Sequence, residues 1–176
     1  MATIYTIGHS TRSLEELMQV LNAHRVSVLV DIRAFPMSRR LPHFNRESLE
    51  QSLPEREIQY LWERRLGGRR KKLRADSPNV ALRNDSFRNY ADYMLTDEFR
   101  AGAADVITMA GEHRVAIMCA ERVYFRCHRM LVSDWLVAHG HEVLHIDDLA
   151  PPRPHKMMAE ARVAGEHVIY DGGELF

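Results

Sequence analysis

The chain has 176 residues, of which 45% are hydrophobic and 27% are charged, so it is long enough for one domain with a full core. It has no basic start followed by a long apolar run, and no apolar stretch approaches membrane-spanning length, so we expect neither a secretory signal nor a membrane span. Two cysteines are too few for a disulfide scaffold. The sequence therefore predicts reduced thiols in a cytoplasmic protein.

The formal net charge is zero, but the charges are unevenly distributed. Residues 33–74 carry 12 Lys and Arg against 5 Asp and Glu, a balance of +7, whereas the chain from Ala75 onward carries 10 against 16, a balance of −6. Arginine suits bidentate contacts with phosphate or carboxylate. The basic segment is consistent with an anionic small molecule or nucleic acid as a partner, although such a run is more commonly a solvated face.

Strand and helix patterns alternate along the chain. In chain order they predict a strand at 3–7, a helix opened by a Ser13–Glu16 capping box, a strand at 26–30, a helix at 46–53 capped by Asn45, and a strand at 58–62. An exposed loop is expected at 66–86, followed by helices at 87–95 and 97–110. The last predicted elements are a strand at 115–118, a helix from His128 to a stop at Gly140, and a strand at 142–146.

This alternation predicts a single α/β domain over residues 1–150, with a mainly parallel sheet and helices on both faces. Residues 151–176 are expected to form a C-terminal extension that packs on the domain or is partly frayed.

Polar or reactive residues end three of the predicted strands: His9 and Ser10, Asp31 and Arg33, and Cys119 and Glu121. In parallel sheets, ligands bind outside the carboxyl ends of the strands. We therefore expect these residues to line one site. The alternative is that Asp31 and Arg33 form a structural ion pair and that His9 caps a turn.

Both cysteines lie around one predicted strand–helix junction, Cys119 at the end of the strand and Cys127 at the start of the helix. A helix amino terminus offers free N–H groups and partial positive charge, which favour a thiolate. Arg126, His128 and Arg129 add positive character beside Cys127. The alternative is that the cysteines are small packing residues, which is the usual role of a buried free thiol.

Several motifs resemble those of the domain-of-unknown-function 488 family. They are Tyr5–Thr11, Val30–Pro36, Phe44-Asn45, Leu66–Arg69, Phe87–Met94, Cys119-Ala120-Glu121 and Cys127-His128-Arg129. The similarity runs from the start of the chain to about Asp147. It implies a compact cytoplasmic α/β domain of bacterial type and marks the motif residues as site candidates. It implies no particular activity.

The first functional hypothesis is an enzyme, a transferase or hydrolase, that uses a thiolate on an anionic substrate bearing phosphate or a nucleotide. Cys127 or Cys119 would be the nucleophile, with His128 or His9 as general base and Glu121 as an acid or orienting group. The anion would be held by groups drawn from Ser10, Asp31, Arg33, Arg69, Arg70 and Arg129.

Two alternatives remain at this level. Cys119, Cys127, His128 and His9 could bind a metal, although their spacing lacks the close Cys-x2-Cys pair of structural zinc sites. The basic segment with Tyr60 and Trp62 could instead make a non-catalytic nucleic-acid or nucleotide-binding module. The sequence identifies neither a cofactor nor an oligomeric state.

Overall fold

The computed structural model describes residues 1–172, so the end of the predicted C-terminal extension, residues 173–176, lies outside the described residues. The helices are α1 (Leu14–Ala23), α2 (Arg46–Ser52), α3 (Asp85–Tyr93), α4 (Asp97–Ala110) and α5 (Arg129–Ala138). The strands are β1 (Thr3–Gly8), β2 (Val28–Asp31), β3 (Gln59–Trp62), β4 (Val115–Cys119), β5 (Glu142–His145), β6 (Arg153–Pro154), β7 (Ala161–Ala164) and β8 (His167–Tyr170).

The predicted α/β fold is confirmed. Six strands form one sheet in the order β3-β2-β4-β1-β5-β6, in which β1 to β5 run parallel and β6 is antiparallel to β5. The first five strands all lead into or out of helices, as parallel connections require. Because β4 pairs with both β1 and β2, the carboxyl ends of these three strands meet at one edge.

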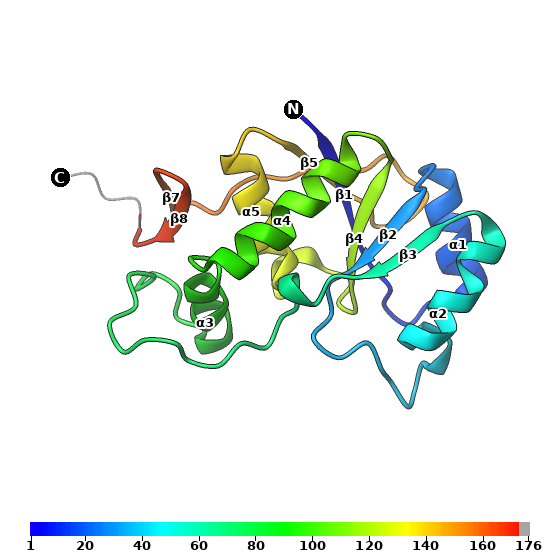
Figure 1. Ribbon diagram of the computed structural model, residues 1–176, viewed down its shortest axis with the longest axis horizontal. Coiled ribbons are helices and arrows are strands. Elements are labelled where there is room, and N and C mark those ends of the chain that lie inside the picture. Colours follow the sequence, from blue (N-terminus) through cyan, green and yellow to red (C-terminus); the bar gives the residue numbers. More distant parts are fainter. Residues whose placement is uncertain (173–176) are drawn as a thin grey trace.

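The core has two layers, because α1 and α2 lie on one side of the sheet and α4 and α5 on the other (Figure 1). Alternate residues of the central strands belong to the two layers. On one face, Tyr5, Leu29 and Met118 pack with the apolar residues of α1 and α2. On the other face, Val30 and Ile117 pack with those of α4 and α5. The strands are buried on both sides, which explains their nearly continuous apolar sequences.

Of the two predicted caps, the one at α1 is present and the side-chain cap at α2 is not. Ser13 and Glu16 form the reciprocal capping box of α1, and at α4 the Thr96 hydroxyl accepts from the third residue of the helix. Asn45 occupies the N-cap position of α2, but its side chain makes no capping bond. Its Oδ1 instead accepts from the backbone N–H of Ser38, because the preceding loop folds back over this end.

The predicted exposed loop over residues 66–86 is exposed only in part. Leu66 belongs to a short 3-10 turn and is fully buried, and Leu82 is also part of the core. Tyr90 and Tyr93 donate to the carbonyl oxygens of Leu66 and Arg65, which anchors the turn to α3. The continuously exposed parts of the segment are residues 71–76 and 83–86.

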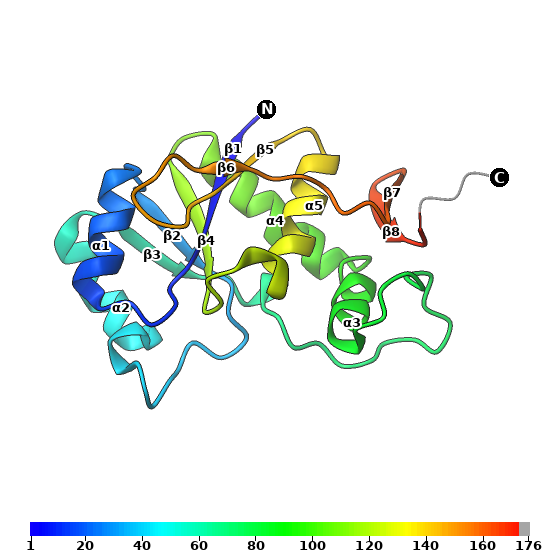
Figure 2. The same cartoon turned by 180° about the vertical axis from the view of Figure 1, so that it is seen from behind.

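The C-terminal segment crosses the sheet edge as β6 and ends in a hairpin, β7–β8, beside α3 and α5 (Figure 2). Tyr170 anchors this hairpin, because its hydroxyl donates to Asp134 at 2.8 Å and its N–H donates to Asn79 at 2.9 Å. Within the described residues, no helix is long and apolar enough to cross a membrane.

Gly8 provides a test of how tightly the carboxyl ends of the strands are packed. A Cβ here would overlap the carbonyl oxygen of Glu121 and lie 2.8 Å from the Cα of Arg122, and both contacts are with backbone that cannot easily move. We predict that Gly8→Ala lowers the free energy of unfolding by about 3 kcal/mol, as overpacking does. Urea denaturation measures the change.

Gly111→Ala is the matched control, because the nearest atom to its added Cβ is 3.3 Å away and its φ of −70° suits alanine. Equal losses of stability in the two variants would contradict the close approach at Gly8.

Candidate functional site

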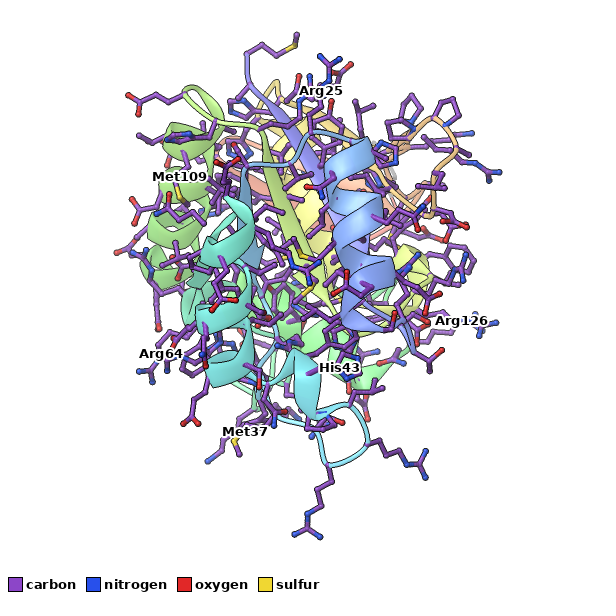
Figure 3. The ribbon with its side chains drawn as sticks, turned by 90° about the vertical axis from the view of Figure 1, so that its right-hand side faces the viewer. Arg25, Met37, His43, Arg64, Met109 and Arg126 are labelled. Carbon is purple, nitrogen blue, oxygen red and sulfur yellow. The ribbon has the colours of Figure 1, made fainter. Side chains whose placement is uncertain are left out.

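The carboxyl end of the sheet gathers the strand-end residues of β1, β2 and β4. His9 and Ser10 donate their backbone N–H groups to the carbonyls of Cys119 and Ala120, both at 2.9 Å, so the turn after β1 follows the turn after β4. Met37, His43 and Arg64 lie toward this end in Figure 3, whereas Arg25 and Met109 lie toward the opposite end.

A pocket of about 500 Å³ opens at this end. Its lining combines both cysteines, cationic side chains and aromatic side chains. The residues are Arg33, Ala34, Phe35, Met37, Gly68, Arg69, Ser86, Phe87, Tyr90, Cys119, Ala120, Glu121, Arg126, Cys127 and His128. The volume lies within the range of small-molecule sites.

The two thiols meet in the pocket wall. Their Sγ atoms lie 2.7 Å apart, and the side chains of Cys119 and Cys127 are 3% and 8% exposed. Both are free cysteines. Cys127 Sγ also accepts the backbone N–H of Arg129, the first residue of α5, at 3.3 Å. The sulfur thus replaces the capping oxygen that His128, the N-cap residue, does not supply.

The protonation of the pair is asymmetric. Burial raises the pKa of Cys127, but the Cys119 hydrogen bond and the positive charges of His128 and Arg129 outweigh it and hold that pKa well below the usual value. Burial, together with the hydrogen bond and negative charge of Cys127, holds the pKa of Cys119 well above it. Two thiolates in contact would repel strongly, so the pair holds one negative charge and one proton.

A hydrogen bond fixes the orientation of the His128 ring beside Cys127. Its Nε2 lies 2.8 Å from the carbonyl oxygen of Ile32, which only accepts, so Nε2 carries a hydrogen. This leaves Nδ1 facing Cys127 Sγ at 3.6 Å. The Tyr90 ring packs against the imidazole, with centroids 5.0 Å apart.

Arg129 lies behind the cysteines and does not line the pocket. Its side chain is 1% exposed and donates to the Thr6 hydroxyl at 3.1 Å and to the carbonyls of Glu121 and Arg122 at 2.6 and 3.1 Å. No acidic side chain among the described residues forms a salt bridge with it, and its Nε contacts no acceptor there. The buried guanidinium therefore stabilises an anion at Cys127.

A buried hydrogen-bond chain continues from Arg129 through Thr6, His145 and His155 to Asp134. The successive distances are 3.1, 2.6, 2.8 and 2.7 Å. Burial and the charges of His155 and Arg129 lower the pKa of His145 to about 3, so this imidazole is neutral. The chain connects the cation beside the cysteines with a carboxylate on the far side of α5.

Arg33, Asp31 and His9 form a second buried network. Arg33 makes a bidentate ion pair with Asp31 and donates to the Phe44 carbonyl at 2.7 Å. His9 donates from Nδ1 to the Ser10 carbonyl and accepts from Arg33 at Nε2. Burial, with the charge of Arg33, lowers the pKa of His9 to about 4. The neutral ring of His9 is directed at Arg33 and not at either sulfur.

The structure brings some of the candidates predicted from the sequence together in the pocket and leaves others outside it. Arg33, Arg69, Cys119, Glu121, Cys127 and His128 line the pocket, whereas His9, Ser10, Asp31, Arg70 and Arg129 do not. Arg70 instead donates to the carbonyls of Gly67 and Arg64 and covers the Tyr93 ring.

Arg126, Phe35 and Tyr90 also line the pocket. The charge of Arg126 was expected there, because this residue directly precedes Cys127. The lining residues that sequence reasoning missed are Met37 and Ser86. Phe35 and Tyr90 lie in family-like motifs, but nothing in their spacing indicated that the two rings face one pocket.

Of the four candidate metal ligands, Cys119, Cys127 and His128 lie together, whereas both ring nitrogens of His9 contact other groups, Ser10 and Arg33. In the part of the chain that the structure describes, no group of three or more His, Cys, Asp or Glu side chains has an arrangement that could hold a metal ion.

Gly68 lets the loop after β3 approach the His128 ring. A Cβ at Gly68 would lie 2.9 Å from Nδ1 and 3.2 Å from Cε1. We predict that Gly68→Ala tilts the ring away from Cys127 and raises the pKa of the thiol, so alkylation at neutral pH slows. Near-unchanged alkylation across the pH range, in a variant that stays folded by circular dichroism, would contradict the role assigned to this ring.

Comparison with known proteins gives one family match. No curated protein and no solved structure matches the chain. The sequence model of DUF488, described as a domain of unknown function, matches residues 13–136. This range contains α1 to α4, α5 without its last two residues, and the strands β2, β3 and β4. Because this match covers more than half of the sequence and both cysteines, the chain belongs to the DUF488 family.

Proposed function

We propose that the pocket is the active site of a cysteine-dependent enzyme in which the Cys127 thiolate attacks an anionic substrate. The observation that carries the proposal is the convergence of three groups on one sulfur: the Arg129 N–H, the Cys119 thiol and the His128 imidazole. Such an environment is typical of reactive cysteines, whereas a packing cysteine is surrounded by apolar atoms.

The charges around the pocket support an anionic substrate. Arg69 and Arg126 are exposed at its lining, and neither forms a salt bridge among the described residues. Glu121 is the only acidic side chain of the lining. Phe35 is 69% exposed and lies under Arg69, which would suit a substrate with a flat or apolar portion beside its charged group.

The reaction begins when Cys127 Sγ forms a bond to an electrophilic atom of the substrate. The bond to the leaving group breaks, and the leaving group takes the proton from His128 Nδ1. A second nucleophile then releases the bound group. This scheme covers both a transferase and a hydrolase, which differ only in whether that nucleophile is a cosubstrate or water.

The non-catalytic nucleic-acid module has less support. The Tyr60 ring packs against the core and its hydroxyl donates to Asp31 at 2.5 Å, and the Trp62 ring is covered by Arg46. Stacking on a base would therefore require both side chains to give up existing contacts. Arg65 and Arg74 of the basic segment are paired with acidic residues.

The pH dependence of alkylation tests the nucleophile. In Cys119→Ser, where the hydroxyl can still donate to Cys127, we expect the iodoacetamide rate to titrate with a midpoint below the free-thiol value of about 8.5. The midpoint moves downward because the thiolate is the reactive form. The alkylation rate therefore persists as pH falls through 8.5 and is lost only when Cys127 gains its proton.

His128→Gln in the same background should move that midpoint upward. His113→Gln is the matched control, because His113 is exposed on the turn before β4, at the opposite end of the sheet. A Cys127 midpoint at or above 8.5 before any histidine is changed would remove the basis for the proposed nucleophile.

Charge selection by the pocket is tested with two alkylating agents of similar size. Relative to a small free thiol, Cys127 should favour the anion iodoacetate over neutral iodoacetamide, and added salt should reduce the preference. Arg126→Gln should lower the rate ratio by roughly threefold, the scale expected for one exposed charge. Arg25→Gln, an exposed arginine at the opposite end of the sheet, should leave it unchanged. Equal ratios in all three proteins would argue against an anionic substrate.

A further inference from the structure

We infer that Cys119 is the resolving partner of Cys127, and that the pocket reduces disulfides of small anionic thiols by forming a Cys119–Cys127 disulfide. This inference rests on the proposed function and names its substrate class. It starts from the contact between the two sulfurs, which are contributed by the end of β4 and the residue before the N-cap of α5.

The geometry suits bond formation between the two side chains. Their Sγ atoms are 2.7 Å apart, so they need to approach by only about 0.7 Å to reach the disulfide length of about 2.05 Å. The seven residues between the cysteines contain the short 3-10 turn Tyr124–Arg126 and neither a long helix nor a strand of the sheet. Closing the bond therefore requires no rearrangement of the sheet.

The second thiol also points to a reaction class. Cys119 Sγ lies 2.7 Å from Cys127 Sγ, and Cys119 is 3% exposed, so the sulfur of Cys127 is the reaction partner within its reach. A substrate that leaves a sulfur on Cys127 creates a disulfide that a neighbouring thiol can attack directly. A disulfide substrate therefore gives Cys119 a defined step, whereas simple hydrolysis gives it none.

The exchange balances in two steps. Cys127–S⁻ attacks R–S–S–R, giving Cys127–S–S–R and R–S⁻, which takes the proton from His128 Nδ1. Cys119 then attacks Cys127 Sγ and expels the second R–S⁻, which takes the Cys119 proton. The substrate gains two electrons and leaves as two R–SH molecules, while the cysteine pair loses two electrons and becomes a disulfide.

The arginines at the entrance favour an anionic R group. Arg69 and Arg126 line the opening, and the aromatic ring of Phe35 lies beside Arg69. A suitable probe is therefore the dianionic aromatic disulfide 5,5′-dithiobis(2-nitrobenzoate), whose released thiolate is measured by absorbance.

With one equivalent of this probe, the wild-type protein should release two equivalents of thionitrobenzoate. It should end about 2 Da lighter, with no adduct, as expected for loss of two hydrogens. The second release should be independent of probe concentration because it is intramolecular. Cys119→Ser should release one equivalent and retain one adduct, and Cys127→Ser should react slowly. Glutathione disulfide should give the same mass change more slowly, as a second anionic substrate.

The outcomes separate the inference from the function on which it rests. A stable adduct on Cys127 in the wild-type protein would overturn the resolving role of Cys119 and leave the nucleophile intact. Failure of Cys127 to react in any variant that remains folded would overturn both. Two adducts formed at equal rates would show two independent thiols and would also overturn the inference.

Discussion

The buried guanidinium of Arg129 is the constraint on which the site depends. A cation that is 1% exposed and has no acidic partner in contact among the described residues is costly to bury, so the fold must supply compensating dipoles and a nearby anion. The carbonyls of Glu121 and Arg122 and the Thr6 hydroxyl provide the dipoles. The Cys127 thiolate provides the anion, and the backbone N–H of Arg129 contacts it. The same interactions fix the turn that carries Glu121 beside Cys119.

Support for Arg129 extends beyond the residues that match the family. His145, His155 and Tyr170 all follow residue 136, where the match ends. His155 and Tyr170 bind opposite oxygens of Asp134, and His145 links His155 to Thr6. Since Asp134 is completely buried on α5, the C-terminal segment supplies partners that this carboxylate would otherwise lack. The segment is thus part of the support of the site and not merely a cover for the sheet.

The sequence predicted which strand ends meet at the site, but not which side chains contact one another there. Apolar runs of strand length separated by helical periodicity gave the sheet, and the rule for parallel strands then gathered the polar residues that follow β1, β2 and β4. The sequence left open whether Arg33 would line the site or pair with Asp31. Arg33 does both, because its buried charge needs the carboxylate as a partner. The β7–β8 hairpin was missed, although Gly165 between two alternating runs is a recognisable turn signal, and its φ is +63°.

The different states of the two thiols follow from their places in the strand–helix unit. Cys119 ends a buried strand, where burial and the negative charge of Cys127 both raise the pKa of its thiol. Cys127 precedes a helix, where the backbone N–H of Arg129 donates to its sulfur and the charges of His128 and Arg129 lower its pKa. Once the negative charge resides on Cys127, repulsion keeps the proton on Cys119. The proposed order of reactivity, with the helix cysteine first and the strand cysteine second, therefore follows from the βα connection itself.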